Sequence, residues 1–421
     1  MDFSDVIKEQ RKELEDKERK ERIIKRSLLD KAKRFLKYPN ILVITGVRRC
    51  GKSIFSYLIA KESSFGYVNF DDERLFGLKT ENLNDLLQAI YELYGDVNYI
   101  ILDEVQNVER WELFATRLRG TKKVILTGSN SKLLSGELAT HLTGRHIDLT
   151  LHPLSFTEFL DLNEFKISKV YTTQEKAEIL RLLKEYLKIG GFPEVHKFGK
   201  EILSGIYNDI ISKDILLRYK IRKKDEIRKL SKYLITNSGG ETSYTKLANI
   251  LNIKHVSTLS NWISYLEDSF LILRLERFSF KLKQQLLAPK KFYCVDPGIV
   301  NTIGFNFSEN IGNFMENIVA LELQRKKSED PSIEIYYWKD YYHGEVDFVI
   351  KRGAKVKQIV QVTYANSKEE IKEREISGLL KCSRELKCSN LIILTWNLEG
   401  EEKIKNKKIK YIPLWKWLLE E

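Results

Sequence analysis

The segment 46–53, with the sequence GVRRCGKS, matches the phosphate-binding loop, in which two glycines separated by four residues precede Lys and Ser. The glycines let the backbone curl until successive N–H groups face phosphate oxygens, and the following helix adds the positive end of its dipole. We expect Lys52 to pair with the β- and γ-phosphates of ATP and Ser53 to coordinate Mg²⁺. The predicted nucleotide contacts come from one continuous segment: Gly46, Val47, Arg48, Arg49, Cys50, Gly51, Lys52, Ser53 and Ile54.

Two acidic residues end an apolar run further along the chain. Residues 99–102 (YIIL) lead directly to Asp103 and Glu104. Carboxylates at the carboxyl end of a buried strand lie where open α/β sheets build their sites. We expect Asp103 to bind Mg²⁺, directly or through water, and Glu104 to act as the general base on the attacking water. Because Asp103 and Glu104 come after a phosphate-binding loop in the sequence, they predict that ATP is hydrolysed as well as bound.

Polar residues after the next predicted strand complete the candidate site. The run 122–130 (KKVILTGSN) ends in Ser129 and Asn130, either of which could contact the γ-phosphate or the attacking water. Arg145 lies further on and is a candidate arginine finger that acts on the ATP of a neighbouring subunit. An ordinary surface or ion-pair arginine is an equally good interpretation of Arg145.

The composition limits the classes of protein to consider. The chain has 421 residues, 43% hydrophobic and 31% charged, which is enough for two or three domains with their own cores. No apolar run reaches the roughly 18 residues of a membrane span, and residues 1–20 contain no hydrophobic signal core. The four cysteines lack the spacing of a zinc site or a disulfide framework. We therefore expect a cytoplasmic protein without a membrane partner. The formal net charge of +12 favours a polyanionic partner such as DNA.

Changes in apolar periodicity divide the chain into segments. Residues 1–37 are expected to form a basic helix that either packs on the following core or contacts nucleic acid or a neighbouring subunit. Residues 38–160 alternate β-rich runs with helices, which predicts a parallel sheet covered on both faces. Residues 161–222 are predicted to form a helical lid.

Residues 223–300 have the order helix, helix, turn, helix and strands that is typical of a winged helix-turn-helix. The helix around residues 255–265 would then be the recognition helix, although Glu267 and Asp268 at its end disfavour deep insertion into a DNA groove. Such folds also serve as protein–protein modules. The residues expected to face DNA are polar or basic: Lys254, His255, Ser257 and Asn261, with Lys246, Thr258, Arg274, Arg277, Lys281 and Lys283 around them.

Together these features resemble the AAA+ superfamily and, more narrowly, an archaeal and bacterial ATPase family that joins an AAA-type core to a C-terminal domain of unknown function. The similar stretches are GVRRCGKS, YVNFDDERL, YIILDEVQNVERWE, LTGSNSKLLSGELATHLTGRHIDLTLHPLSFTEFL, GGFPEV and YNDIISKDI. The resemblance implies a homo-oligomer, commonly a ring such as a hexamer, because the finger arginine of one subunit acts on its neighbour.

The last segment, 301–421, resembles the PD-(D/E)xK nuclease fold. Such nucleases use two or three acids to bind divalent metal and a lysine to orient water. The resemblance assigns Glu316 and Asp347 to the acidic positions, but Gln361 and Thr363 stand where a glutamate and the lysine are expected. Glu345, on the same face of its strand as Asp347, would compensate only in part. We therefore favour a segment that keeps the nuclease fold and binds DNA or a subunit over an active nuclease.

The resulting fold prediction is an α/β protein with a P-loop sheet core, a helical lid, a winged helix and a C-terminal restriction-endonuclease-like α/β domain. The functional prediction is an ATP-hydrolysing, oligomeric DNA-binding motor or remodeller. The alternatives are an ATP-dependent signalling or defence switch that acts on protein partners, and an active ATP-dependent nuclease.

Overall fold

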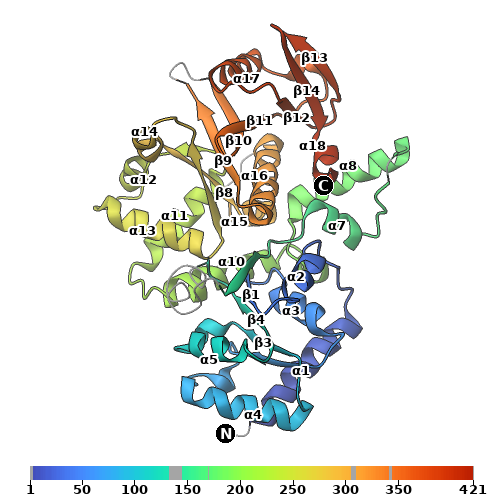
Figure 1. The fold of residues 1–421 in the computed structure, drawn as a ribbon. Helices are drawn as coiled ribbons and strands as arrows, with labels where there is room; N and C mark the ends of the chain where they lie inside the picture. Colours follow the sequence, from blue (N-terminus) through green and yellow to red (C-terminus); the bar gives the residue numbers. More distant parts are fainter. Residues whose placement is uncertain (1–2, 132–144, 169, 305–309, 341–343, 421) are drawn as a thin grey trace. The chain divides into compact units, whose positions relative to one another are not determined.

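The computed structural model describes residues 3–131, 145–168, 170–304, 310–340 and 344–420 (Figure 1). The chain divides into two compact units. The first contains residues 1–153, 161–164 and 268–270, and the second contains residues 154–160, 165–267 and 271–421. In the described ranges, no helix is both long enough and apolar enough to cross a membrane.

The first unit is built on a parallel sheet with the strand order β2-β3-β4-β1-β5. Its strands are β1 (Ile41–Thr45), β2 (Phe65–Asn69), β3 (Tyr99–Asp103), β4 (Lys123–Gly128) and β5 (His146–Thr150). Every residue of β1 is buried, as the continuous apolar run ILVIT predicts for a strand covered on both faces. The predicted parallel α/β core is confirmed, and β5 is an additional strand that sequence analysis did not identify.

Helices and short 3₁₀ turns connect these strands. They are α3 (Lys52–Ala60), η1 (Glu73–Leu75), η2 (Thr80–Asn82), α4 (Leu83–Tyr94), η3 (Val105–Asn107) and α5 (Trp111–Leu118). Leu86 and Ile90 of α4 and Phe114 of α5 belong to one apolar cluster with Ile100 and Val124 of the sheet. This cluster holds β3 and β4 in place, and both strands end at the candidate site.

The N-terminal segment forms two helices, so the prediction of a single helix over residues 1–37 is wrong. α1 (Phe3–Lys20) and α2 (Leu29–Phe35) flank an irregular stretch. α1 buries Phe3, Val6 and Ile7 in the apolar cluster of the first unit. Arg26 lies in the stretch between the two helices. Its side chain is buried and donates to the backbone carbonyls of Cys50 and His152.

The second unit begins with a group of helices. They are α7 (Phe156–Leu162), α8 (Thr173–Ile189), α9 (Val195–Phe198), α10 (Ile202–Asp209), the π-helical η5 (Ile210–Leu217) and α11 (Lys224–Thr236). α8 starts at a capping box, in which Thr172 and Glu175 satisfy each other's backbone N–H groups.

Residues 241–294 contain three helices and three short strands. The elements are β6 (Glu241–Thr242), α12 (Tyr244–Ile250), α13 (Val256–Asp268), β7 (Ile272–Arg277), α14 (Leu282–Leu287) and β8 (Lys290–Cys294). β8 pairs antiparallel with both β6 and β7. α13 buries Leu259, Trp262, Ile263 and Leu266, so one helical face packs inward. Assignment of this segment as a DNA-binding winged helix stays a prediction.

The C-terminal strands continue the same sheet, whose order is β13-β14-β12-β11-β10-β9-β7-β8-β6. The strands are β9 (Ile333–Lys339), β10 (Glu345–Arg352), β11 (Lys355–Val362), β12 (Leu391–Thr395), β13 (Gly400–Ile404) and β14 (Lys407–Pro413). The helical elements are α15 (Pro297–Ile303), α16 (Ile311–Glu329), η6 (Lys368–Glu370), α17 (Glu373–Glu385) and α18 (Leu414–Leu419). β7 and β9 pair in parallel. The segments 223–300 and 301–421, predicted as separate domains, therefore share one sheet.

The turn at residues 190–195 (GGFPEV) is held in place by hydrogen bonding to the buried Asp296. Asp296 accepts hydrogen bonds from the backbone N–H groups of Gly191 (2.6 Å), Gly298 (2.8 Å) and Ile299 (3.2 Å), so it both caps α15 and holds the turn after α8. Gly190 has φ +78°, and a Cβ there would lie 1.9 Å from the Asp296 carboxylate. Both the backbone angle and the close approach require glycine.

We expect Gly190→Ala to lower the free energy of unfolding by about 3 kcal/mol or more, because the new methyl group would collide with Asp296 and the residue would be strained. Chemical denaturation of the full chain measures this. Gly205→Ala is the matched control, because its Cβ would meet no atom within 4 Å inside α10. That control should be neutral or slightly stabilising. Equal stability of the two variants would contradict the proposed role of the Asp296 contact.

Candidate functional site

The loop 46–51 links the end of β1 to the start of α3 and has a backbone that glycines make possible. Gly46 and Gly51 have φ of +151° and +101°. A Cβ on Gly46 would lie 2.1 Å from the carbonyl oxygen of Leu151. The thiol of Cys50 is buried and donates to the same carbonyl at 3.2 Å, and burial raises its pKa. Cys50 is thus a packed structural residue of the loop.

Lys52 lies at the start of α3, with only 5% of its surface exposed. Its ammonium donates to the carbonyl oxygens of Gly46 (3.2 Å) and Val47 (3.3 Å). The same nitrogen is 3.5 Å from Oε1 of Glu104, so the loop lysine and the second acid of β3 are adjacent. Lys52 therefore lies where the loop and the acidic pair meet.

Asp103 is buried and hydrogen-bonded on both carboxylate oxygens. Tyr67 donates to Oδ2 at 2.6 Å, Thr127 donates to Oδ1, and the hydroxyl of Ser53 also hydrogen-bonds to this carboxylate. Burial raises the pKa of Asp103, and the neighbouring charge of Glu104 adds to the effect. The adjacent Ser53 hydroxyl and Asp103 carboxylate are hard oxygen donors, which fit a Mg²⁺ ion that takes its other ligands from phosphate and water.

Glu104 follows β3 in a left-handed conformation, with φ +51°. Oε2 accepts a hydrogen bond from the backbone N–H of Ser129 (3.3 Å) and another from the amide of Gln106. Burial alone would raise the pKa of Glu104, but the positive charges of Lys52 and Arg48 hold it below its ordinary value. Glu104 is therefore an ionised carboxylate held in a fixed orientation, as a general base requires.

Ser129 and Asn130 are buried directly after β4, and β4 lies between β1 and β3. The strand order therefore puts these two residues between the phosphate loop and the acidic pair. Arg48 also lies near this edge of the sheet and forms an ion pair with Asp71 at 3.1 Å. Arg49 is exposed and takes a left-handed conformation, with φ +66°.

Arg145 lies at the opposite end of the strands from the phosphate loop. It directly precedes His146, which pairs with Ile41 at the start of β1. Gly46 follows the end of β1, so Arg145 is displaced from the loop by about 20 Å along the strand direction. Its side chain is exposed. This position rules out contact with the ATP of its own chain and leaves the prediction of an arginine finger for a neighbouring subunit untested.

Arg26 contacts the phosphate loop, and sequence analysis did not identify it. Nη1 donates to the carbonyl of Cys50 at 3.1 Å, and Nη2 donates to the carbonyl of His152 at 2.6 Å. Only 8% of its surface is exposed. Arg26 occurs in a segment rich in Lys and Arg, so nothing in the sequence distinguishes it from its solvent-exposed neighbours. Tyr67 and Thr127 were missed for a similar reason, because each lies within an ordinary β-rich run.

The residues predicted to face DNA lie on the exposed side of the turn before α13 and of α13 itself. Lys254, His255, Ser257 and Asn261 are all exposed, whereas Trp262 of the same helix is buried. Arg274 is also exposed but donates to the hydroxyl of Tyr244 at 2.9 Å. The four predicted residues thus form one polar surface, which we call the α13 face.

The acidic residues of the nuclease-like segment do come together. Glu316 of α16 and Asp347 of β10 both contact the ammonium of Lys291, a residue of β8 that sequence analysis did not connect with them. Gln361 of β11 donates to Asp347 at 2.7 Å. Thr363 leaves the expected lysine position of the motif without an ammonium group, but β8 brings Lys291 to these acids from a distant part of the sequence.

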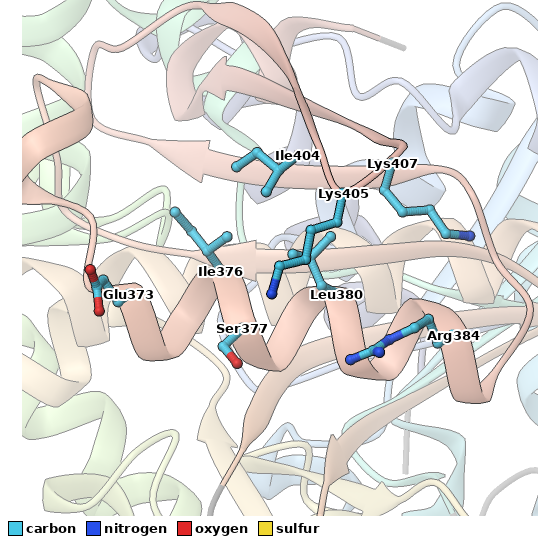
Figure 2. A pocket seen from close by; sticks show the side chains of 8 residues that line it. All are labelled: Glu373, Ile376, Ser377, Leu380, Arg384, Ile404, Lys405 and Lys407. Atoms are coloured by element: carbon cyan, nitrogen blue, oxygen red, sulfur yellow. The ribbon is translucent and has the colours of Figure 1, made fainter.

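A separate pocket of about 390 Å³ lies between α17 and the hairpin of β13 and β14 (Figure 2). Figure 2 shows Ile376, Leu380 and Ile404 on its walls, with Arg384 and Lys407 toward one side. The other lining residues are Glu373, Ser377 and Lys405. None of the residues predicted to bind ATP, metal or DNA lines it.

Three family models match consecutive parts of the chain. They are an AAA domain over residues 38–160, a domain of unknown function (DUF8612) over residues 180–310 and a domain of unknown function (DUF4143) over residues 311–417. The chain is similar to the uncharacterized protein MJ1544 of Methanocaldococcus jannaschii, with 39% identity over 403 residues that cover 90% of this chain and 89% of that protein. An uncharacterized protein of Haemophilus influenzae is 33% identical over 306 residues, covering 68% of this chain and 74% of that protein.

The chain also aligns in part with solved structures of other proteins. The Walker-type ATPase PABY2304 of Pyrococcus abyssi has a TM-score of 0.45 at 14% identity, covering 67% of this chain and 96% of that chain. The Orc1 protein of Aeropyrum pernix, solved in complex with DNA, has a TM-score of 0.32 at 11% identity, covering 73% of this chain and 94% of that chain.

We expect Arg26→Ala to weaken ATP binding by about tenfold, because the Cys50 carbonyl loses a charged donor and the loop loses its support. Titration with a fluorescent ATP analogue measures the affinity, and circular dichroism checks the fold. Lys25→Ala is the matched control, because Lys25 is exposed and forms an ion pair with the exposed Asp30. Wild-type affinity in a folded Arg26→Ala protein would show that the loop does not depend on this contact.

Proposed function

The chain belongs to the family of AAA-domain proteins that includes MJ1544, and we propose that it hydrolyses ATP to act on DNA. The observation that carries the ATPase proposal is the convergence of four side chains at one edge of the first sheet. Lys52 lies 3.5 Å from Glu104, and Ser53 hydrogen-bonds to Asp103. A phosphate-binding lysine, two oxygen ligands for Mg²⁺ and an ionised base are the groups that phosphoryl transfer to water requires.

Each of these side chains has a distinct part in the proposed hydrolysis. The backbone N–H groups of the loop and the start of α3 hold the phosphates. Lys52 exchanges the carbonyls of Gly46 and Val47 for phosphate oxygens, because charged acceptors bind an ammonium more strongly than neutral carbonyls do. Ser53 and Asp103 would hold Mg²⁺, which would offset the negative charge of the phosphates. Glu104, fixed by the Ser129 N–H, polarises the attacking water.

The contact between Lys52 and Glu104 suggests how binding precedes hydrolysis. In the structure, the two charges partly compensate each other. When Lys52 turns to the phosphates, Glu104 loses that partner and its carboxylate becomes a better acceptor for a water proton. The general base is thereby activated only when the nucleotide is bound.

We expect Glu104→Gln to lower the rate of ATP hydrolysis by at least about a hundredfold while ATP still binds, because glutamine keeps the shape but cannot accept the proton. Lys52→Ala should weaken binding as well as abolish hydrolysis. Phosphate release and ATP titration separate the two effects. Glu109→Gln is the control and should behave as wild type, because Glu109 is exposed and lies between η3 and α5, in the segment that follows Glu104. Normal hydrolysis by Glu104→Gln would show that Glu104 is not the base.

The proposal that DNA is the partner is supported by charge and by exposed polar side chains. The chain has a formal net charge of +12, and the α13 face consists of basic and polar side chains, with the exposed Val256 between them in the sequence. Basic and amide side chains on a helix that packs by its opposite side are suited to phosphate and base contacts. A DNA-dependent ATPase of this kind would act as a motor or remodeller, and assembly into a homo-oligomer would let Arg145 reach the ATP of a neighbouring subunit.

A second candidate function, a switch that acts on a protein, is favoured by α14. Phe280, Leu282, Leu286 and Leu287 are 61–75% exposed and lie together in sequence beside β7. A group of exposed apolar side chains is typical of a protein-binding surface. The response of ATP hydrolysis to DNA separates this function from the first.

We expect duplex or single-stranded DNA to bind with a steep dependence on salt concentration and to raise the rate of ATP hydrolysis. Replacing Lys254 with Ala should lower the salt slope by about one unit, because one phosphate contact is lost. Fluorescence anisotropy across a salt series measures the slope. Lys166→Ala, which changes an exposed lysine away from the α13 face, is the control. DNA proves not to be the ligand if no DNA structure binds at low salt or changes turnover.

A further inference from the structure

Lys291 is a buried lysine surrounded by three carboxylates. It lies on β8 with 2% of its surface exposed. Its Nζ is 2.6 Å from Glu345 Oε1, 3.0 Å from Glu316 Oε1 and 3.3 Å from Asp347 Oδ1. We call these four residues the Lys291 cluster. One ammonium group thus contacts every acid that the resemblance to nucleases would assign to a divalent metal.

Neighbouring groups occupy further hydrogen-bonding positions of the same carboxylates. Tyr293 donates to Glu316 Oε1 at 2.7 Å. On Asp347, Oδ2 accepts from the Gln361 amide at 2.7 Å and from the backbone N–H of Val362 at 3.0 Å. Lys339 lies 3.6 Å from Oε2 of Glu345. The acids are therefore oriented toward protein donors from three different strands, β8, β9 and β11.

These residues do not fit a divalent metal ion. Mg²⁺ needs oxygen ligands at about 2.0–2.1 Å in near-octahedral geometry, and a buried ammonium at the centre of the carboxylates would repel it. Over the ranges of the chain that the structure describes, no set of three or more His, Cys, Asp or Glu side chains is arranged to hold a metal. Gln361, in place of an acid, also removes one charge from the cluster.

The charge state of Lys291 agrees with this geometry. Burial alone would lower the pKa of a lysine, but Glu316, together with Tyr293, Asp347 and Glu345, raises the pKa of Lys291 well above its ordinary value. Lys291 is therefore an ammonium at any physiological pH. Burial raises the pKa of Asp347 to about 7, and the charge of Glu316 adds to this.

We propose that the Lys291 ammonium permanently takes the place of the catalytic metal, so that the nuclease-like segment is a clamp between β8 and the C-terminal strands and not a nuclease. The cluster joins β8, which belongs to the segment around the α13 face, to α16 and β10. The only strand pairing between those two parts of the sheet in the described residues is the short β7–β9 ladder, with Glu276 opposite Tyr336 and Arg277 opposite Tyr337. The buried ion cluster reinforces that short junction.

The decisive variant is Lys291→Met, which keeps the length of the side chain and removes its charge. Glu316, Glu345 and the buried Asp347 would then face one another without the ammonium between them, so the full-length protein should melt roughly 5 °C or more below the parent. Mn²⁺ should enter the vacated position, restore part of the lost Tm and bind at least about tenfold more tightly than to the parent. All proteins are studied without nucleotide and with Asp103→Ala, so that the ATP site does not take up Mn²⁺.

Two further variants make the result specific. Lys290→Met removes the adjacent buried lysine, whose ammonium donates to the carbonyls of Gln285 and Leu286, and should gain no affinity for Mn²⁺. Lys291→Met combined with Glu316→Gln and Asp347→Asn removes the repulsion and should recover stability without binding Mn²⁺. If Lys291→Met does not fold, recovery of folding in this triple variant supports the clamp, and failure of the triple variant overturns it.

The parent protein gives the remaining test. With Lys291 present, it should bind no Mn²⁺ at the cluster and should leave DNA intact in Mg²⁺ or Mn²⁺. Metal-dependent cleavage of DNA that is lost in Asp347→Ala would overturn the proposal. Unchanged stability and unchanged Mn²⁺ affinity in Lys291→Met would overturn it as well.

Discussion

The candidate ATP site depends on the register of three adjacent parallel strands. Thr45 at the end of β1 pairs with Gly128 of β4, and Leu126 of β4 pairs with Leu102 of β3. The chain segments that leave these strands therefore emerge side by side at one edge of the sheet. A register shift of one residue would turn the strand's side chains to the opposite face, so the apolar packing that fixes the register also fixes the chemistry.

Lys52 and Lys291 are both buried lysines of candidate sites, but they contact different kinds of groups. The groups that a lysine contacts decide whether its ammonium can leave them to bind a ligand. Lys52 contacts the carboxylate of Glu104 at 3.5 Å and the neutral carbonyl oxygens of Gly46 and Val47, which charged phosphate oxygens can replace. Lys291 has three carboxylates within 3.3 Å, and removing it would leave these closely spaced acids, of which Asp347 is buried, without the ammonium between them. The first arrangement suits a ligand-binding lysine and the second a structural one. Both side chains are almost fully buried, so burial alone does not distinguish the two roles.

Sequence patterns predicted the parts of the structure that are local in the chain. The phosphate loop and the acids after β3 are continuous motifs, and the run ILVIT has the apolar continuity of a buried parallel strand. Arg26 and Lys291 were not predictable in this way, because their partners lie far away in the sequence: Cys50 and His152 for Arg26, and Glu316, Glu345 and Asp347 for Lys291. The single N-terminal helix was predicted wrongly because the pattern of charge did not show that Arg26 turns inward.

The continuous sheet of the second unit bears on how an ATP-driven change could be used. If the segment around the α13 face were an independent domain, it could move against the C-terminal strands. The β7–β9 ladder and the Lys291 cluster both oppose such movement, the ladder by backbone pairing and the cluster by the cost of separating buried charges. Movement within the sheet would have to break both at once. The α13 face and the strands β9 to β14 should therefore respond to nucleotide as one body.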